Sequence, residues 1–293
     1  MTRVLLTGAT GRLGSAFLSL WSSRGDFSVI ALSRDDADLS KPEQLEDILH
    51  SYDFEVLVNP AAMSGLEECL DKPDDANAIN AQSPEVMAKV CSEKNARFIH
   101  FSTDYVFSGE EPDRKSESGG TAPVNEYGKT KLLGEQKILD QYPGALIARV
   151  SWLFGPTPAD RPCHFDQVLE RAISGDPQQY IHDKYSMPTF THDVVRWTEA
   201  LLKNKESQGV YHLCNTGEPE SWHSSAEKLC LLAVEQGALI KRPGISALSI
   251  TDAHFFREKR PVHTAMFPTR LVDEGIAHPR HWLDAATDYL KIR

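Results

Sequence analysis

This 293-residue sequence has no long hydrophobic run and no excess of positive charge. None of its apolar stretches approaches the ~20 residues that a helix needs to cross a bilayer. Lysine and arginine number 31 against 42 aspartates and glutamates, which gives a formal charge of −11. General nucleic-acid binding needs clustered cations, so this balance disfavours it. The first strand is predicted to start by Arg3, which leaves no room for a signal peptide. We therefore expect a soluble, cytoplasmic protein that binds neither membranes nor nucleic acids.

Cysteine is scarce, and neither cysteine nor histidine shows the spacing of a metal site. The five cysteines are widely separated and odd in number, which suits reduced thiols better than a disulfide framework or a zinc site. The eleven histidines contain no His-Glu-x-x-His pattern. We expect no bound metal.

The sequence does contain a regular alternation of short apolar runs and longer amphipathic stretches. The runs cover residues 4–6, 28–32, 55–58, 97–101 and 145–150. Their shortness and near-continuous apolarity are typical of parallel strands buried on both faces. The stretches between them predict helices, one of which opens with the capping-box pattern Ser40-Lys41-Pro42-Glu43. This order predicts an α/β fold built on a doubly wound parallel (Rossmann) sheet.

The pattern changes after about Leu153, where we expect a smaller C-terminal substrate-binding lobe to begin. Helices are predicted near residues 164–174, 192–203 and 222–236, and strands at 179–182 and 209–213, before a loop-rich tail. We assign residues 1–153 to a dinucleotide-binding domain, with a later contribution from residues 190–214. Residues 154–189 and 215–293 are assigned to the substrate-binding lobe.

A glycine-rich turn, Thr7-Gly8-Ala9-Thr10-Gly11-Arg12-Leu13-Gly14, follows the first predicted strand. Gly8 permits a tight turn, Gly11 lets the backbone approach a pyrophosphate, and Gly14 lets the next helix pack closely on the sheet. Phosphates would then bind free N–H groups at the helix N-terminus. An ordinary β–α turn is the alternative, but the place between a buried strand and an amphipathic segment favours a cofactor site.

The end of the second predicted strand indicates which dinucleotide binds. NAD sites usually place Asp or Glu there to bind the ribose hydroxyls, whereas this sequence has Leu32-Ser33-Arg34. Ser33 can donate a hydrogen bond to a 2′-phosphate, and Arg34 can pair with it. Asp35 and Asp36 follow, either as surface residues or as ribose ligands. We expect NADP(H) to be preferred, and NAD(H) stays open.

A set of proton-transfer groups follows the fourth predicted strand. That strand ends in Ser102-Thr103-Asp104-Tyr105-Val106-Phe107, and Tyr127-Gly128-Lys129-Thr130-Lys131 comes about twenty residues later. Tyr127 and Lys131 share a helix face at this spacing. We expect the Lys131 ammonium to lower the pKa of the Tyr127 phenol, which makes Tyr127 a general acid for a carbonyl oxygen. The Thr103 hydroxyl, at the carboxyl end of its strand, can hold the same oxygen.

With these motifs in this order, the chain resembles extended short-chain dehydrogenases/reductases, and within them the dTDP-4-dehydrorhamnose reductase family. The resemblance covers nearly the whole chain and is most specific up to Trp152. The matching stretches are residues 102–107, 125–132, 134–135, 151–152, 183 with 188–189, 209–213, 221–222 and 260–261.

The resemblance implies NADPH-dependent reduction of the keto group of a nucleotide-linked deoxysugar. Three residues would be catalytic: Thr103, Tyr127 and Lys131. The implied cofactor-binding residues are Gly8, Thr10, Gly11, Arg12, Leu13, Gly14, Ser33, Arg34, Asp38, Leu39, Ala61, Ala62, Met63, Tyr127 and Lys131. The implied substrate-binding residues are Asp104, Tyr105, Trp152 and Arg260.

Departures from the family pattern fall mostly in the predicted substrate lobe. The family's Asp-Gln-x-Gly-x-Pro-Thr stands here as Asp183-Lys184-Tyr185-Ser186-Met187-Pro188-Thr189, and His263 and Thr264 replace a usual Asn and Ser. After the third strand, Asn59-Pro60-Ala61-Ala62 replaces Asn-Ala-Ala-Ala. The cofactor chemistry is therefore better determined by the sequence than the identity of the sugar.

Other functions and the assembly stay open. One alternative is a nucleotide-sugar epimerase or 4,6-dehydratase of the same superfamily. Dehydratases follow the threonine with an Asp-Glu pair, whereas Thr103-Asp104 is followed here by Tyr105. Another is a non-catalytic regulatory subunit that resembles the β subunit of methionine adenosyltransferase. A homodimer is also left open.

Arg34→Ala is expected to weaken NADPH binding by about 1–3 kcal/mol, the usual effect of losing a charge-assisted hydrogen bond, and to leave NADH binding nearly unchanged. Titration of both cofactors into the wild type and the variant measures this. If the wild type binds both cofactors equally and the variant changes neither, Arg34 does not contact the 2′-phosphate.

Overall fold

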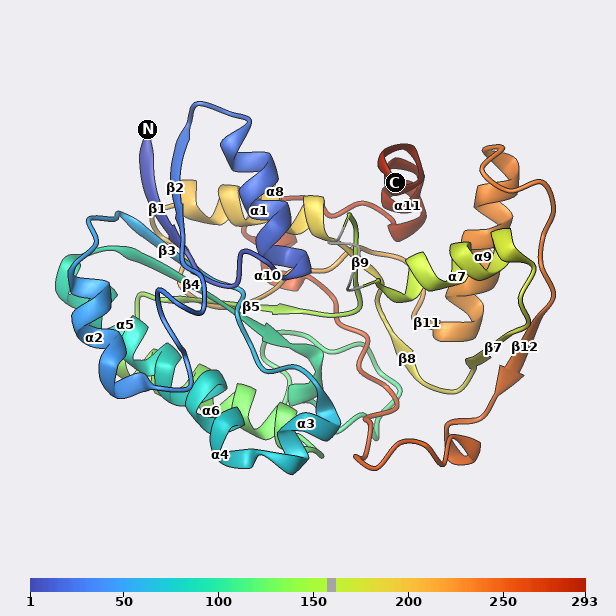
Figure 1. The fold of residues 1–293 in the computed structure, drawn as a ribbon, viewed down its shortest axis with the longest axis horizontal. Coiled ribbons are helices and arrows are strands. Elements are labelled where there is room, and N and C mark those ends of the chain that lie inside the picture. Colours follow the sequence, from blue (N-terminus) through green and yellow to red (C-terminus); the bar gives the residue numbers. More distant parts are fainter. Residues whose placement is uncertain (157–161) are drawn as a thin grey trace.

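A six-stranded parallel sheet forms the centre of the computed structural model, which describes residues 1–156 and 162–293 (Figure 1). Its strands lie in the order β10-β5-β4-β3-β1-β2, and every neighbouring pair is parallel. They are β1 (Thr2–Leu6), β2 (Phe27–Ala31), β3 (Val56–Asn59), β4 (Arg97–Thr103), β5 (Leu146–Val150) and β10 (Gly209–His212). The predicted doubly wound sheet is confirmed.

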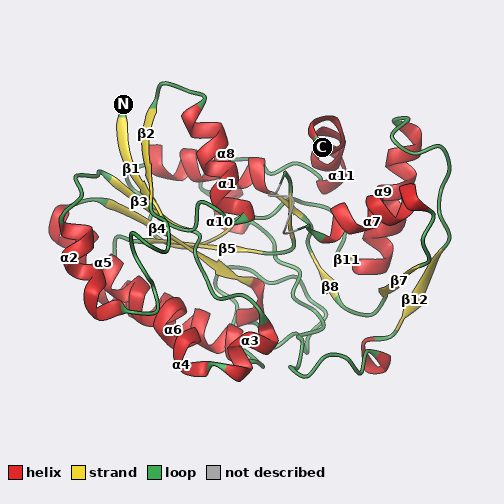
Figure 2. Cartoon of the chain, viewed as in Figure 1, coloured by secondary structure: helices red, strands yellow, loops and turns green. Residues whose placement is uncertain are grey.

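Successive strand residues are buried on opposite faces of this sheet, which explains their near-continuous apolar runs. Val4 and Leu6 belong to one hydrophobic core with the helices α1 (Arg12–Ser22) and α8 (Thr191–Lys203). Leu5 belongs to the core on the other face. The helices there are α2 (Pro42–His50), α5 (Ser83–Lys94) and α6 (Glu126–Gln141). Figure 2 shows the two helical layers on either side of the strands.

A third hydrophobic core lies in the C-terminal part of the chain. It includes residues of α7 (His164–Ser174), α9 (Trp222–Glu235) and α11 (Trp282–Ile292), beside the parallel pair β7 (Gln178–Ile181) and β12 (Ile245–Leu248). In Figure 1, α7, α9, β7 and β12 stand together away from the central sheet. Residues 157–161, inside the range assigned to the substrate lobe, lie outside the described part of the chain.

Short elements complete the chain. They are α3 (Leu66–Asp71), α4 (Pro73–Asn77), the π-helix η1 (Ala78–Gln82), the 3₁₀ helices η2 (Asp104–Val106) and η3 (Ile250–Asp252), β6 (Leu153–Phe154), β8 (Tyr185–Ser186), β9 (Thr189–Phe190), β11 (Glu220–Ser221) and α10 (Thr269–Asp273). Across residues 1–156 and 162–293, no helix combines the length and apolarity needed to cross a membrane.

One local expectation was wrong. Ser40 does not cap α2, because its hydroxyl donates to Asp38 Oδ1 at 2.8 Å, and the helix begins at Pro42 after Lys41. Within the loop-rich tail, α11 forms from Trp282 to Ile292 and buries Trp282 and Tyr289. Proline at the first helical position needs no N–H partner, which lets α2 start without a side-chain cap.

Helix α6 lies unusually close to its neighbours at two glycines. A Cβ atom on Gly128 would lie 2.2 Å from the carbonyl oxygen of Tyr105, and one on Gly134 would lie 2.2 Å from that of Asn80. Both distances are far below van der Waals contact, and both neighbours are backbone atoms that cannot swing away. These glycines therefore set how deeply α6 packs.

Gly134→Ala is expected to lower the free energy of unfolding by about 1–3 kcal/mol, the usual cost of overpacking, because the new methyl group must push α6 away from Asn80. Chemical denaturation of the wild type and the variant measures this. Gly25→Ala is the matched control, since nothing lies within 4 Å of its added Cβ. Equal stability of both variants would show that the close approach at Gly134 is not a constraint.

Candidate active site

The turn between β1 and α1 is shaped by glycine. Gly8 has φ +58°, and a Cβ there would lie 2.9 Å from the backbone of Ala61. A Cβ on Gly14 would lie 2.1 Å from the carbonyl oxygen of Gly8. The turn thus packs against the loop after β3. Helix α1 begins at Arg12 with Gly11 as its N-cap, so its first N–H groups have no partner within the helix, an arrangement that suits a phosphate.

The segment after β2 already holds a carboxylate. The Ser33 backbone N–H and hydroxyl donate to Asp36 Oδ2 at 2.8 and 2.7 Å, and these bonds lower the pKa of Asp36. Arg34 is exposed beside them. The sequence did not predict the hydrogen bonds between Ser33 and Asp36. Because the Asp36 carboxylate occupies both Ser33 donors, a 2′-phosphate would have to replace it to bind them.

Thr103 and Tyr127 come together at the carboxyl end of β4. Asn125 positions Tyr127 by capping α6, since its side-chain oxygen accepts a hydrogen bond from the Gly128 N–H at 2.8 Å. The Tyr127 ring packs edge-on against Tyr105, with centroids 5.9 Å apart. Burial raises the pKa of the Tyr127 phenol, and a hydrogen bond with Thr103 opposes this only in part. The phenol therefore keeps its proton at neutral pH.

The expected lowering of the Tyr127 pKa by Lys131 does not occur in this structure. The Lys131 side chain is buried, and its Nζ atom lies 2.8 Å from His100 Nε2 and 2.6 Å from the Phe101 carbonyl oxygen. Its hydrogen bonds therefore run to β4 and not to Tyr127. Burial also lowers the pKa of Lys131 to about 7, which weakens its positive charge near neutral pH.

His100 joins Lys131 to the ends of two more strands. His100 Nδ1 lies 2.9 Å from Asn59 Nδ2, and the Thr7 hydroxyl donates to Asn59 Oδ1 at 2.6 Å. All four side chains are buried, and burial lowers the pKa of His100 well below its ordinary value. The sequence offered a signal for Asn59 and His100, because both are polar residues within or beside an apolar run.

Asp104 connects β4 to the C-terminal part of the chain. Its Oδ2 atom accepts hydrogen bonds from the hydroxyls of Ser186 at 2.7 Å and Thr264 at 2.6 Å, and Oδ1 accepts from Thr103 at 3.2 Å. Burial raises the pKa of Asp104, while Lys184 and the three hydroxyls act in the opposite direction.

The other predicted substrate residues lie in different surroundings. Trp152 lies between β5 and β6 and has φ +37°, a left-handed conformation that costs a non-glycine residue about 1–3 kcal/mol. Arg260 is nearly buried and pairs with Glu67 at 3.0 Å, and its guanidinium lies 3.4 Å from the centroid of the Phe256 ring. No local pattern in the sequence indicates this pair, because Glu67 and Arg260 lie 193 positions apart.

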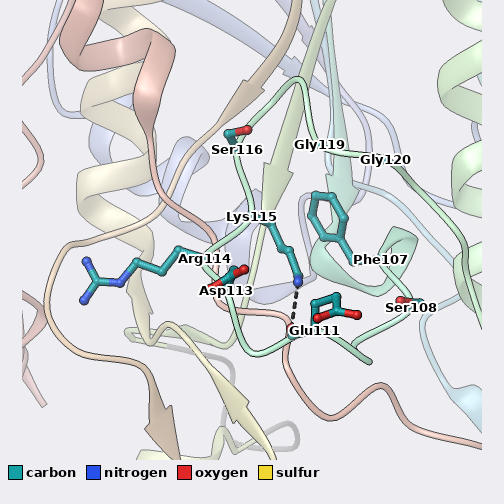
Figure 3. Close-up of a pocket in the computed structure, with 9 residues that line it drawn as sticks. All are labelled: Phe107, Ser108, Glu111, Asp113, Arg114, Lys115, Ser116, Gly119 and Gly120. Carbon is teal, nitrogen blue, oxygen red and sulfur yellow. Dashed lines mark hydrogen bonds between the residues drawn. The ribbon is translucent and has the colours of Figure 1, made fainter.

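A surface cavity of about 290 Å³ lies elsewhere, beside the loop after η2 (Figure 3). Its two cations already have partners. Lys115 donates to the Glu111 carbonyl oxygen at 2.7 Å, and Arg114 pairs with Glu218 at 3.0 Å. The cavity includes none of the predicted site residues.

The family is decided by comparison with known proteins. The family model described as RmlD substrate binding domain matches residues 1–293. The chain belongs to this family. The dTDP-4-dehydrorhamnose reductase of Mycolicibacterium smegmatis, also similar, is 29% identical over 289 residues, which span 98% of this chain and 84% of that protein. The predicted resemblance is confirmed.

Solved structures of proteins with the same name share this RmlD-type fold. A dTDP-4-dehydrorhamnose reductase from Clostridium acetobutylicum has a TM-score of 0.88 and 25% identity, with 99% of each chain covered. One from Bacillus anthracis, solved in complex with NADP, has a TM-score of 0.90 and 22% identity, with 100% of this chain and 99% of that chain covered. The similarity extends over both the sheet and the C-terminal part.

Lys131→Met is expected to change how stability depends on pH. Between the folded pKa of about 7 and the unfolded value of 10.5, the unfolded chain holds a proton on Lys131 that the folded protein has lost. Raising the pH therefore stabilises the wild type relative to the variant, by up to about 1.4 kcal/mol per pH unit. Denaturation of both proteins at several pH values from 7 to 9 measures the difference.

The control is Lys89→Met, at a partly exposed lysine whose pKa is raised by Glu46. Lys89 stays protonated in both states over this range, so its difference from wild type should not vary with pH. A flat difference for Lys131→Met as well would show that burial does not lower the pKa of Lys131.

Proposed function

We propose that this chain reduces the keto group of a nucleotide-linked deoxysugar with NADPH, as a dTDP-4-dehydrorhamnose reductase does. The observation that carries the proposal is the Thr103–Tyr127 hydroxyl pair at the carboxyl edge of the sheet, which the glycine turn also adjoins. Ligands of open α/β sheets bind at this edge.

The names of relatives support the same reaction. Besides the M. smegmatis protein, a dTDP-4-dehydrorhamnose reductase of Aggregatibacter actinomycetemcomitans is 28% identical over 288 residues, with 96% of each protein covered. The NADP in the B. anthracis complex supports the cofactor. Arg34, exposed next to the Ser33 donors, supports the preference for NADPH over NADH.

The residues present fit a dinucleotide. We assign its pyrophosphate to the turn of Gly8, Thr10, Gly11, Arg12, Leu13 and Gly14, its 2′-phosphate to Ser33 and Arg34, its adenine to Asp38 and Leu39, and its nicotinamide end to Ala61, Ala62, Met63, Tyr127 and Lys131. Glycine lets this turn pack tightly, since a Cβ on Gly8 or Gly14 would strike backbone, and the turn leads into the N-terminus of α1, where a phosphate can bind. NADPH, when bound, supplies the hydride.

Besides the hydride, the reduction needs a proton and a group that orients the keto oxygen, and Tyr127 and Thr103 supply them. The substrate's keto oxygen gains negative charge as its carbon is reduced, and it then needs a proton. Tyr127 holds that proton, because burial keeps its phenol neutral. Thr103 orients the oxygen once its hydroxyl turns from Asp104 Oδ1 to donate to the substrate, and Lys131 holds the nicotinamide ribose from its place beside His100. Asp104, Tyr105, Trp152 and Arg260 are assigned to the sugar.

The assignment of cofactor binding and sugar binding to different parts of the chain is also a proposal. Residues 1–153 with 190–214 would bind the cofactor, and residues 154–189 with 215–293 would bind the sugar. The pairing of β10 with β5 and the packing of α8 on α1 support the first assignment. We also propose a cytoplasmic location, which the five free, buried cysteines support. A homodimer is proposed as well.

Tyr127→Phe is expected to lower kcat by about 10²–10⁴-fold while leaving NADPH affinity close to normal, because only the proton donor is lost. The assay follows NADPH oxidation with a 4-keto-6-deoxy nucleotide sugar, and fluorescence titration gives the cofactor affinity. Normal turnover in the variant would remove Tyr127 from the mechanism.

The same preparation distinguishes the alternatives. A nucleotide-hexose incubated without added cofactor should be left unchanged, because Tyr105 stands where a dehydratase needs a second carboxylate. Dehydration of that sugar would favour a dehydratase. Activity on neither sugar would favour a regulatory subunit.

A further inference from the structure

Lys184 is a buried cation beside the proposed sugar site. It directly precedes β8 and is 1% exposed. Its Nζ atom lies 5.1 Å from the centroid of the Tyr105 ring and 5.1 Å from that of the Trp152 ring. Tyr105 and Trp152 are both assigned to the sugar, so the ammonium lies where the substrate is proposed to bind.

This ammonium has no hydrogen-bond partner among residues 1–156 and 162–293. Ring faces attract a cation but do not replace the oxygen acceptors that an ammonium has in water. Asp104 influences Lys184 through its charge, yet no ion pair within 4.0 Å joins the two among the described residues. A buried donor left unsatisfied is costly, and an oxygen placed beside it would recover that cost.

We infer that Lys184 donates a hydrogen bond to a ring hydroxyl of the substrate sugar and thereby selects sugars that carry this hydroxyl. The inference rests on the proposed function, because it takes the sugar site from it. Asp104 is the residue after Thr103, which is proposed to hold the keto oxygen. A group between Lys184 and Asp104 is therefore close to the reacting carbon, and we assign the hydroxyl to C2 or C3 of a 4-keto sugar.

A neutral hydroxyl fits better than an anionic substituent. Burial lowers the pKa of Lys184 to about 8, so the side chain is still mostly charged at neutral pH. Asp104, already supplied with three hydroxyl donors, offsets that charge. A carboxylate on the sugar would place a second negative charge in this buried region, whereas a hydroxyl accepts from Lys184 and adds no charge.

The experiment pairs three sugars with four proteins. The sugars are a 4-keto-6-deoxy nucleotide sugar with hydroxyls at C2 and C3 and its 2-deoxy and 3-deoxy counterparts. The proteins are the wild type, Lys184→Met, Lys184→Gln and the control Lys89→Met, which makes the same change at a partly exposed residue of α5. Calorimetry gives Kd for each pair and NADPH oxidation gives kcat/KM, while thermal unfolding confirms that each variant is folded.

For the wild type and Lys89→Met, one of the two deoxy sugars is expected to bind about 10- to 100-fold more weakly than the full sugar. Lys184→Met should lose this discrimination, because it binds the full sugar as weakly as that deoxy sugar. Lys184→Gln keeps a neutral hydrogen-bond donor and should retain part of the discrimination between the sugars. This variant also tests the inference if Lys184→Met does not fold.

Equal losses for all three sugars in Lys184→Met would overturn the inference, because a merely structural lysine has that effect. Wild-type protein that binds none of the sugars, or all three equally, would also overturn it. Discrimination in Kd without NADPH oxidation would instead uphold the role of Lys184 and contradict the proposed reduction.

Discussion

The buried hydrogen-bond chain from Thr7 through Asn59 and His100 to Lys131 fixes the geometry on which the rest of the site depends. It crosses from the end of β1 to β3, β4 and α6. Each member is buried, so each would be costly without its partner, and the position of one side chain determines the next. Because Tyr127 lies four residues before Lys131 on α6, the same chain holds the phenol at the end of β4. The glycine turn begins next to Thr7, so the cofactor and proton-donor regions share one support.

Asp104 provides the second tie, between the sheet and the C-terminal part. Its partners Ser186 and Thr264 are 82 and 160 residues away in sequence, and both contribute hydroxyls to one carboxylate oxygen. Hydroxyl donors favour the charged carboxylate, which burial alone would oppose. Three hydroxyl donors and the ammonium of Lys184 thus oppose the effect of burial on the Asp104 carboxylate. This carboxylate lies at the junction where the sugar is proposed to bind. The left-handed backbone of Trp152 lies at the same junction, and strain of this kind persists only where surrounding contacts hold it.

The sequence predicts those features that depend on local pattern. Apolar runs such as residues 145–150 identify strands, because burial on both faces leaves few polar positions, and the spacing of Gly8, Gly11 and Gly14 identifies the turn. The sequence does not predict side-chain contacts whose two partners come from distant segments. The pairing of Arg260 with Glu67 joins residues 193 positions apart, and the hydrogen bonds of Lys131 run to a strand that helical spacing alone does not specify. The capping box predicted at Ser40 is absent for a different reason, since the Ser40 hydroxyl bonds to Asp38 within the same loop.

The protonation of Lys131 is coupled to the tautomer of His100. With the Thr7 hydroxyl donating to Asn59 Oδ1, the Asn59 amide nitrogen faces His100 Nδ1, and that ring atom must accept. A neutral ring then carries its proton on Nε2 and donates to Lys131, which requires the lysine to be an uncharged amine. Such a state fits a lysine pKa of about 7 and a histidine pKa held well below its ordinary value. The charged lysine needs the opposite tautomer, with Nδ1 donating to a rotated Asn59 amide. A proton arriving at Lys131 therefore rearranges the hydrogen bonds as far as Thr7, at the edge of the glycine turn.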